Sequence, residues 1–274
     1  MRRLFMADAS GLSRSTLRWG EHTGRWRRVA CQVYGEGPES PTPLDLARAK
    51  LLASGEVARD DIAGLLLGLD SVVFRDRPRR RYLPPPQRLV VIEGIRCGSG
   101  IQTLIDLAAI LDDLRWEQAL ESALRNGLVT VDELLEALPA LGRARVPGTA
   151  RIRRVLQRRR PGEPPTESVL ETMMVQLGRE VPEVEWFERQ YVVNDEDGLF
   201  IARLDLSRPD VGAFVELDGE QHKDQPVYDA IRQTNVVAAT GWLPGRFTWT
   251  EVTRFPTVTK RRLATLFRRA RVRR

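Results

Sequence analysis

In the segment VGAFVELDGEQHKD, residues 211–224, two acidic residues on one face of a predicted strand lie close to a histidine. Apolar residues alternate there with Phe214, Glu216 and Asp218, and this period of two is typical of a half-buried strand. His222, one of only two histidines in the chain, follows the strand. These side chains could either face solvent or bind a metal ion through their carboxylate oxygens.

A neighbouring segment, GLFIARLDLS, contributes a third acid, Asp205, to a second predicted strand. The connection SRPDVG contains the residue types that favour tight turns, so we predict an antiparallel hairpin. Asp205 would then lie opposite Phe214 or Glu216, and directly opposed residues share a face of the sheet. The pattern therefore predicts that Asp205, Glu216 and Asp218 converge on one face.

Three carboxylates on one face repel one another, so proteins rarely collect them without compensating charge. Mg²⁺ (or Mn²⁺) bound by a few carboxylates and by substrate phosphate would supply that charge. Such an ion can activate a water molecule and stabilise the charge that develops on a phosphodiester. The alternative is a polar strand edge in water, in which Asp218 and Gly219 form a turn and His222 is a surface or capping histidine.

The elements around this hairpin predict an α/β (α+β) unit, with helices on both faces of a small mixed sheet in the order α-β-β-β-α-β. Its first helix places Leu170, Met173, Met174 and Leu177 on one face. The strand that closes the unit, RFTWTEV, follows Pro244 and Gly245, which predict that it starts late or is distorted. The predicted elements are a helix at 166–180, strands at 183–193, 198–207 and 211–218, a helix at 227–241 and a strand at 246–252.

The N-terminal segment predicts a helix through Leu17 and Trp19, capped by Ser13 or Ser15, and then one strand, RWRRVACQVYG at 25–35. Helix, turn and strand in this order indicate a winged-helix-like fragment whose arginines could contact phosphates. A small solvated module is the alternative. The arginines of the segment are Arg14, Arg18, Arg25, Arg27 and Arg28.

The middle of the chain is mainly helical, with apolar stripes at a spacing typical of core-facing helices. Thr130 and Glu133 form the pattern of a capping box. A short basic helix at 151–160, which contains Arg154, could be a DNA clamp or a tether, and PGEPP after it is typical of a linker. The other predicted elements are helices at 41–55, 58–70, 101–113, 115–127 and 130–141 and a strand at 89–93. We predict three regions: 1–95, 96–160 and 161–274.

The charge of the chain suits a polyanionic partner, because 43 lysines and arginines oppose 37 acids for a net charge of +6. The last residues, 259–274, predict a basic amphipathic helix with an apolar stripe of Leu263, Leu266 and Phe267. This helix could dock on the C-terminal core and present Arg268 to DNA, or form a solvated, frayed terminus. No apolar run is long enough to span a membrane. We also expect no secretory signal, a cytoplasmic location, and two inert buried thiols at Cys31 and Cys97.

Several motifs of the C-terminal half carry a family resemblance: ESVLE, RLDLS, VELDGEQH, YDAIRQ, and GW followed by RFTW. Through them residues 164–258 resemble the PD-(D/E)XK nuclease superfamily, and within it the endonuclease-like proteins related to very-short-patch mismatch repair nucleases. The N-terminal part is similar to the winged-helix and linker region of abortive-infection-type antitoxins, although it lacks the first helix of a complete winged helix. The likeness covers nearly the whole chain.

The resemblance implies a restriction-endonuclease-like domain and a role for each acid. Asp205 would be the first metal-binding aspartate and Glu216 the second acid, while Asp218 stands where the superfamily usually has lysine. His222 would transfer a proton, and Glu167 would be the helix acid that orients the metal or water. Asp229 and Arg232 match a structural pair that is common in the group.

We therefore expect a metal-dependent DNA endonuclease, acting in repair or defence, with Asp205, Glu216 and Asp218 as metal ligands. The alternative is a catalytically inactive DNA-binding regulator on the same fold. A weaker alternative is a protein whose basic segments bind RNA or an acidic partner, but an aromatic-rich RNA-binding strand is not evident. The arginines expected to bind DNA are Arg14, Arg18, Arg27, Arg154 and Arg268.

Overall fold

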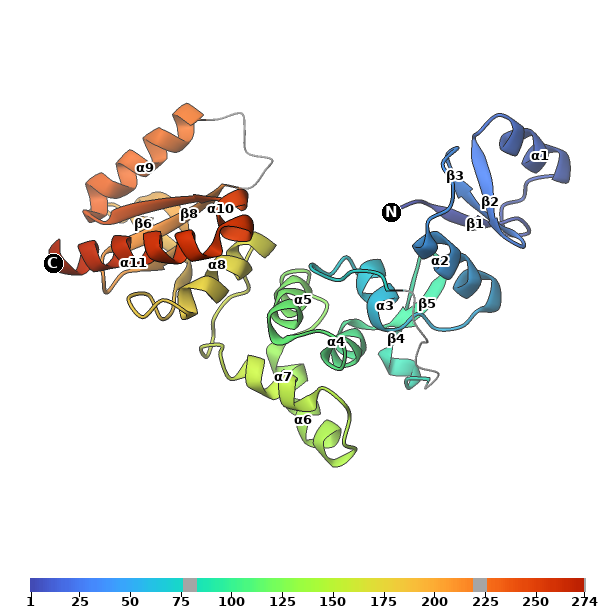
Figure 1. The fold of residues 1–274 in the computed structure, drawn as a ribbon, viewed down its shortest axis with the longest axis horizontal. Coiled ribbons are helices and arrows are strands. Elements are labelled where there is room, and N and C mark those ends of the chain that lie inside the picture. Colours follow the sequence, from blue (N-terminus) through green and yellow to red (C-terminus); the bar gives the residue numbers. More distant parts are fainter. Residues whose placement is uncertain (76–82, 219–225, 274) are drawn as a thin grey trace. The chain divides into compact units, whose positions relative to one another are not determined.

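The computed structural model describes residues 1–75, 83–218 and 226–273, and it is a mixed α and β structure with three small sheets (Figure 1). Contacts divide the chain into two compact units. Unit 1 comprises residues 1–123 and 127–156, and unit 2 comprises residues 124–126 and 157–274. Residues 1–95 and most of 96–160, predicted as separate regions, thus belong to one unit. No helix in the described part of the chain is long and apolar enough to cross a membrane.

Unit 1 begins with a three-stranded sheet, β1 (Leu4–Met6), β2 (Trp26–Ala30) and β3 (Val33–Glu36), in the order β1-β3-β2. The predicted helix is α1 (Arg14–His22), and Ser13 caps it by accepting a hydrogen bond from the Thr16 N–H at 3.1 Å. The single strand predicted at 25–35 is wrong, because Ala30 pairs with Val33 and the chain reverses between them. Alternation continues through both arms of this hairpin, so the period alone did not reveal the turn.

The rest of unit 1 is mainly helical, as predicted, and Thr130 and Glu133 form the expected capping box at the start of α6. The strand predicted at 89–93 is β4, but its antiparallel partner β5 was not predicted. The chain turns between them at Glu93 and Gly94, which both have positive φ. The elements are α2 (Pro43–Ser54), α3 (Asp60–Leu66), the 3₁₀ turn η1 (Pro86–Arg88), β4 (Leu89–Ile92), β5 (Ile95–Gly98), α4 (Gly100–Ala108), α5 (Asp113–Arg125), α6 (Val131–Arg143) and α7 (Thr149–Leu156).

Unit 2 follows the predicted order α-β-β-β-α-β and continues with two further helices. Its sheet has the order β6-β7-β8-β9, in which β6, β7 and β8 are antiparallel and β9 returns parallel to β8 after the crossover helix α9. The elements are α8 (Val169–Arg179), β6 (Glu188–Asn194), β7 (Phe200–Arg208), β8 (Ala213–Asp218), α9 (Pro226–Thr240), β9 (Leu243–Thr248), α10 (Trp249–Arg254) and α11 (Pro256–Arg273).

The last strand differs from its prediction at both ends. Pro244 and Gly245 lie inside β9 and do not delay its start, since β9 is an edge strand and an edge tolerates a residue without an N–H. The strand ends early because Thr248 and Glu251 form a capping box that begins α10. The predicted strand residues after Thr248 are therefore helical.

Helices cover both faces of the unit 2 sheet (Figure 1). On one face, Leu206, Val215 and Phe247 pack with the apolar sides of α8 and α11. On the other face, Phe214 packs with Val236 of α9. Of the two alternatives for the basic C-terminal helix, docking on the core is confirmed, because Leu263 and Phe267 are fully buried there. The sheet is thereby fixed on both sides, and Asp205, Glu216 and Asp218 share a cavity with the start of α8 and with α9.

Candidate functional site

A cleft of about 1020 Å³ in unit 2 contains most of the acids that the sequence singled out. It is bordered by the start of α8, by α9 and by strands β7, β8 and β9. Among the described residues, five carboxylates and three guanidiniums line it. They are Glu167, Glu171, Asp205, Glu216 and Asp218, and Arg203, Arg232 and Arg246.

The hairpin of β7 and β8 brings two of these acids, Asp205 and Glu216, to the same cleft. The strands pair Leu206 with Val215, and beyond that pair the Leu217 N–H donates a hydrogen bond to the Asp205 carboxylate. Phe214, one of the two partners predicted for Asp205, pairs with Ser207 instead, and the strand pairing ends before Glu216, the other. The turn residues of the connection favour this hairpin, which is why the sequence could predict it.

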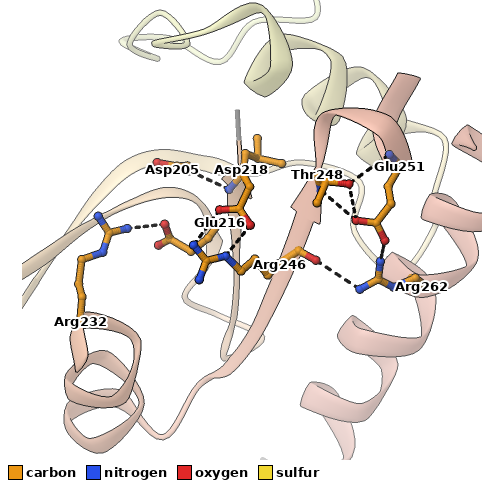
Figure 2. Close-up of polar contacts among 9 residues, drawn as sticks. Asp205, Glu216, Asp218, Arg232, Arg246, Thr248, Glu251 and Arg262 are labelled. Carbon is orange, nitrogen blue, oxygen red and sulfur yellow. Dashed lines mark hydrogen bonds and ion pairs between the residues drawn. The ribbon is translucent and has the colours of Figure 1, made fainter. Parts of the chain in front are cut away.

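Asp205 is half-buried, and its Oδ2 accepts a hydrogen bond from the Leu217 N–H at 3.0 Å (Figure 2). Burial raises the pKa of the Asp205 carboxyl above its ordinary value. The hydrogen bond from Leu217 and the positive charge of Arg232 oppose that rise, whereas the negative charge of Glu167 adds to it. The carboxylate therefore lies where additional positive charge would be stabilising.

The other two strand acids form ion pairs with arginines (Figure 2). Arg232 of α9 contacts Glu216. Arg246 of β9 donates from Nε and Nη2 to the two carboxylate oxygens of Asp218, at 2.6 and 2.8 Å. Asp218 therefore has a side-on partner from the neighbouring strand, which the sequence did not predict.

The start of α8 adds two acids to the cleft. Ser168 caps the helix by accepting from the Glu171 N–H at 3.1 Å, and Glu171 accepts from the Glu167 N–H at 2.9 Å and from Gln190 at 3.0 Å. Glu171 thus lies in the first turn of α8 and is also buried against the cleft. Burial raises the pKa of the Glu171 carboxyl, and repulsion from Asp205 raises it further. Glu167 is exposed and pairs with Arg203, 2.7 Å away.

The net charge of the cleft is negative and would favour binding of a cation. Among the described residues that line it, five carboxylates against three guanidiniums leave a formal charge of −2, which a single divalent cation would neutralise. Carboxylate oxygens are also the donors that Mg²⁺ prefers. As placed, however, no group of three or more His, Cys, Asp or Glu side chains within residues 1–75, 83–218 and 226–273 is arranged to hold a metal ion. The donor chemistry fits such an ion, and arginines hold two of the donors.

The arginines expected to bind DNA fall into two classes. Arg14, Arg18 and Arg27 are exposed on α1 and β2, and of these Arg27 donates to the Ser40 hydroxyl at 3.2 Å. The other two are paired with acids. Arg154 contacts Asp113 through two nitrogens, each at 2.7 Å, and Arg268 contacts Glu183 at 2.6 Å.

Three further predictions concern single residues. His222 lies outside the described residues, as does the side chain of Asp229. Both cysteines are free, but Cys31 is exposed, so the prediction that it is buried is wrong. Cys97 is buried as predicted, and burial raises its pKa to about 11.

Arg203 and Arg246 are the residues of the cleft that sequence analysis missed. Both lie on strands, one at the start of RLDLS and the other at the start of RFTW, so each stood beside a motif that was recognised. For Arg246 the signal available was its position in register with Glu216 of the neighbouring strand, whereas Arg203 lies opposite Val192. In a chain with 43 lysines and arginines, that signal does not identify a partner.

Comparison of the chain with protein-family models, with curated proteins and with solved structures finds no match. The properties of the cleft therefore have to support any functional conclusion. Those properties are the five carboxylates and three arginines among the described residues of one cavity, and the raised pKa values of Asp205 and Glu171.

Proposed function

We propose that the protein is a metal-dependent DNA endonuclease, with a restriction-endonuclease-like domain of the PD-(D/E)XK type in unit 2 and a winged-helix-like, DNA-binding region at the N-terminus. The observation that carries this proposal is the cleft, in which Asp205 and Glu216 line one cavity whose described side chains carry a formal charge of −2. The order α8-β6-β7-β8-α9-β9 is the order expected for such a domain.

The proposed reaction is hydrolysis of a phosphodiester bond. Asp205 and Glu216 would hold Mg²⁺ or Mn²⁺, and Glu167 would orient the ion or a water molecule. A bound ion would lower the pKa of a water molecule and stabilise negative charge on the phosphate. The water oxygen then bonds to phosphorus, the ester P–O bond breaks, and the leaving oxygen takes up a proton. His222 is the proposed carrier of the proton lost by the water.

DNA as the substrate is supported by the charge of the chain and by the exposed arginines. The chain has a net charge of +6 although its proposed active site is acidic. The side chains of Arg14 and Arg18 make no hydrogen bond or ion pair with any other described residue, and they lie one turn apart on α1. Such side chains suit sequence-independent contacts with phosphates.

One observation favours a second candidate, a catalytically inactive DNA-binding regulator. Arg232 and Arg246 neutralise Glu216 and Asp218, so two of the predicted ligands have protein partners. A site that has lost its metal would keep its fold through such pairs. This candidate predicts salt-sensitive DNA binding that does not change when divalent cations are removed.

Incubation with supercoiled plasmid separates the two candidates. With Mg²⁺ or Mn²⁺ the native protein should nick or linearise the plasmid, and chelator should stop the reaction. Asp205→Ala and Glu216→Ala should abolish cleavage, since each removes a ligand, while DNA binding is retained. Glu180→Gln is a matched control, because Glu180 is an exposed acid of the same unit, paired with Lys260. Equal cleavage by Glu216→Ala and the native protein would exclude the proposed mechanism.

Thermal unfolding gives a second measurement that does not need the right DNA. Binding of an ion to the native state alone raises the unfolding temperature with ion concentration. We expect Mn²⁺-dependent stabilisation of the native protein and of Glu180→Gln, and none for Glu216→Gln. Stabilisation that survives in Glu216→Gln would place the ion elsewhere.

A further inference from the structure

Arg246 has a position in the cleft that neither the motifs nor the proposed metal site explains. It lies on the edge strand β9, in parallel register with Glu216 of β8. Its Nε and Nη2 contact the two carboxylate oxygens of Asp218, at 2.6 and 2.8 Å (Figure 2). The two side chains are 41% and 32% exposed, so the pair faces the cleft rather than the core.

The ion pair is not what holds β9 in place. The strand is paired with β8 along its length, and Phe247 is buried in the core beneath it. Arg262 of α11 donates to the Arg246 carbonyl at 3.3 Å and also contacts Glu251 of α10, so the backbone is fixed from the other side (Figure 2). Exposed ion pairs typically contribute about 0.2–1 kcal/mol to stability, which is small beside the strand pairing and the burial of Phe247. The geometry of this ion pair therefore calls for another explanation.

The three cleft arginines differ in how their carboxylates hold them. In their contacts with the cleft acids, Arg203 contacts Glu167 through Nη2 alone, and Arg232 contacts Glu216 through Nη2 alone. Arg246 uses two nitrogens, and this side-on contact fixes the plane of the guanidinium as well as its position. A guanidinium carries five N–H donors in a rigid fork that matches phosphate oxygens. A planar, positively charged group is thus held in a fixed orientation beside Glu216.

We propose that Arg246 binds the phosphate group of the phosphodiester that is cleaved, and that Asp218 is a positioning residue which orients Arg246. This inference rests on the proposed nuclease function. It replaces the metal-ligand role predicted for Asp218, because both oxygens of that carboxylate contact Arg246. Arg246 is then a catalytic residue, which stabilises negative charge as it develops on the phosphate oxygens.

The variants Arg246→Ala, Arg246→Lys, Asp218→Asn and the double variant Asp218→Asn/Arg246→Ala test the roles of the two residues. Arg246→Ala should lower kcat for plasmid nicking by about 10²-fold, and Arg246→Lys should restore part of it because it keeps the charge but loses the fork. Asp218→Asn should lower kcat less than Arg246→Ala does. The double variant should have the same kcat as Arg246→Ala, since Asp218 acts through Arg246.

Metal binding distinguishes a positioning role for Asp218 from a ligand role. Stabilisation by Mn²⁺ should be retained in Asp218→Asn and Arg246→Ala, whereas Glu216→Gln should lose it. Loss of Mn²⁺ stabilisation in Asp218→Asn would make Asp218 a ligand and overturn the inference. Unchanged kcat in Arg246→Ala would overturn it as well.

Binding without metal keeps the inference testable if the native protein cleaves nothing. In chelator, Arg246→Ala should weaken binding of a short fluorescent DNA duplex and reduce the slope of log K against log salt by about 1, the effect of one lost phosphate contact. Glu180→Gln is again the control. The absence of cleavage and of metal stabilisation in the native protein would refute the nuclease, whereas an unchanged salt slope in Arg246→Ala would refute the phosphate contact.

Discussion

Two arginine–aspartate pairs have nearly the same geometry but lie in different surroundings. In unit 1, Arg59 contacts Asp106 through Nε at 2.5 Å and Nη2 at 2.6 Å. In unit 2, Arg246 contacts Asp218 through the same two nitrogens at 2.6 and 2.8 Å. The first pair is 3% and 1% exposed, and the second is 41% and 32% exposed. Contact geometry alone therefore does not say what such a pair does.

The surroundings decide the role. Asp106 also accepts a hydrogen bond from Gln102 at 3.0 Å, and the pair joins the start of α3 to α4 within the core of unit 1. Taking charges out of water is costly, so each buried partner depends on the other. The cleft pair borders a cavity of about 1020 Å³, where water or an anion can reach the guanidinium. The buried pair stabilises the fold, and the cleft pair can bind a ligand at little cost to it.

The largest effect on stability should come from breaking the buried pair. Asp106→Ala removes the carboxylate that two nitrogens of Arg59 contact, and leaving a guanidinium buried without it should lower the free energy of unfolding by about 3–5 kcal/mol. Chemical denaturation followed by circular dichroism measures the change. Asp106→Asn keeps the shape and one oxygen, so it should cost less than Asp106→Ala. A loss below 1 kcal/mol in Asp106→Ala would show that burial does not separate the two pairs.

Cys97 provides a pH test of the same interior. It is buried in β5 and pairs with Ala58, the residue before Arg59. Burial raises the pKa of its thiol from 9.0 to about 11, so the folded protein holds the proton more tightly than the unfolded chain does. This contribution is fully present below pH 9.0 and is lost as the pH rises toward 11. The free energy of unfolding lost through this thiol between pH 7 and pH 10 is about 1.4 kcal/mol.

Urea denaturation at pH 7 and pH 10 isolates this contribution when the native protein is compared with Cys97→Ala. The native protein should lose about 1.4 kcal/mol more than the variant over this interval, because the variant has no thiol to ionise. All other titrating groups are common to both proteins. An equal loss of unfolding free energy in the native protein and in Cys97→Ala would mean that burial does not raise the pKa of the Cys97 thiol.

The parts of this fold that sequence analysis found were those encoded locally. The turn residues between β7 and β8 predicted the hairpin whose strands carry Asp205 and Glu216, and Thr130 with Glu133 marked the start of α6. The features that it missed depend on which elements lie next to one another in the folded structure. The strand β9 tolerates Pro244 only because it lies at the sheet edge, and no short pattern shows which strand will be an edge.

The ion pairs show the same limit at the site. Arg246 and Asp218 are 28 residues apart, and Arg59 and Asp106 are 47 apart. With 43 basic and 37 acidic residues in the chain, spacing cannot select these partners. The acids of the cleft could be anticipated because they alternate along strands, whereas the arginines that hold two of them could not. The proposed role of Asp218 changed from metal ligand to positioning residue for that reason.

The smallest effect on stability should come from the cleft pair. Asp218→Ala should change the free energy of unfolding by less than about 1 kcal/mol, because water solvates the guanidinium when the carboxylate is removed. A double-mutant cycle with Arg246→Ala measures the coupling between the two side chains, and we expect about 0.2–1 kcal/mol, the range of exposed pairs. A coupling of several kcal/mol would make the pair a structural element like Arg59 and Asp106. A small coupling combined with a large loss of cleavage in Arg246→Ala is the result that separates a ligand-binding arginine from a structural one.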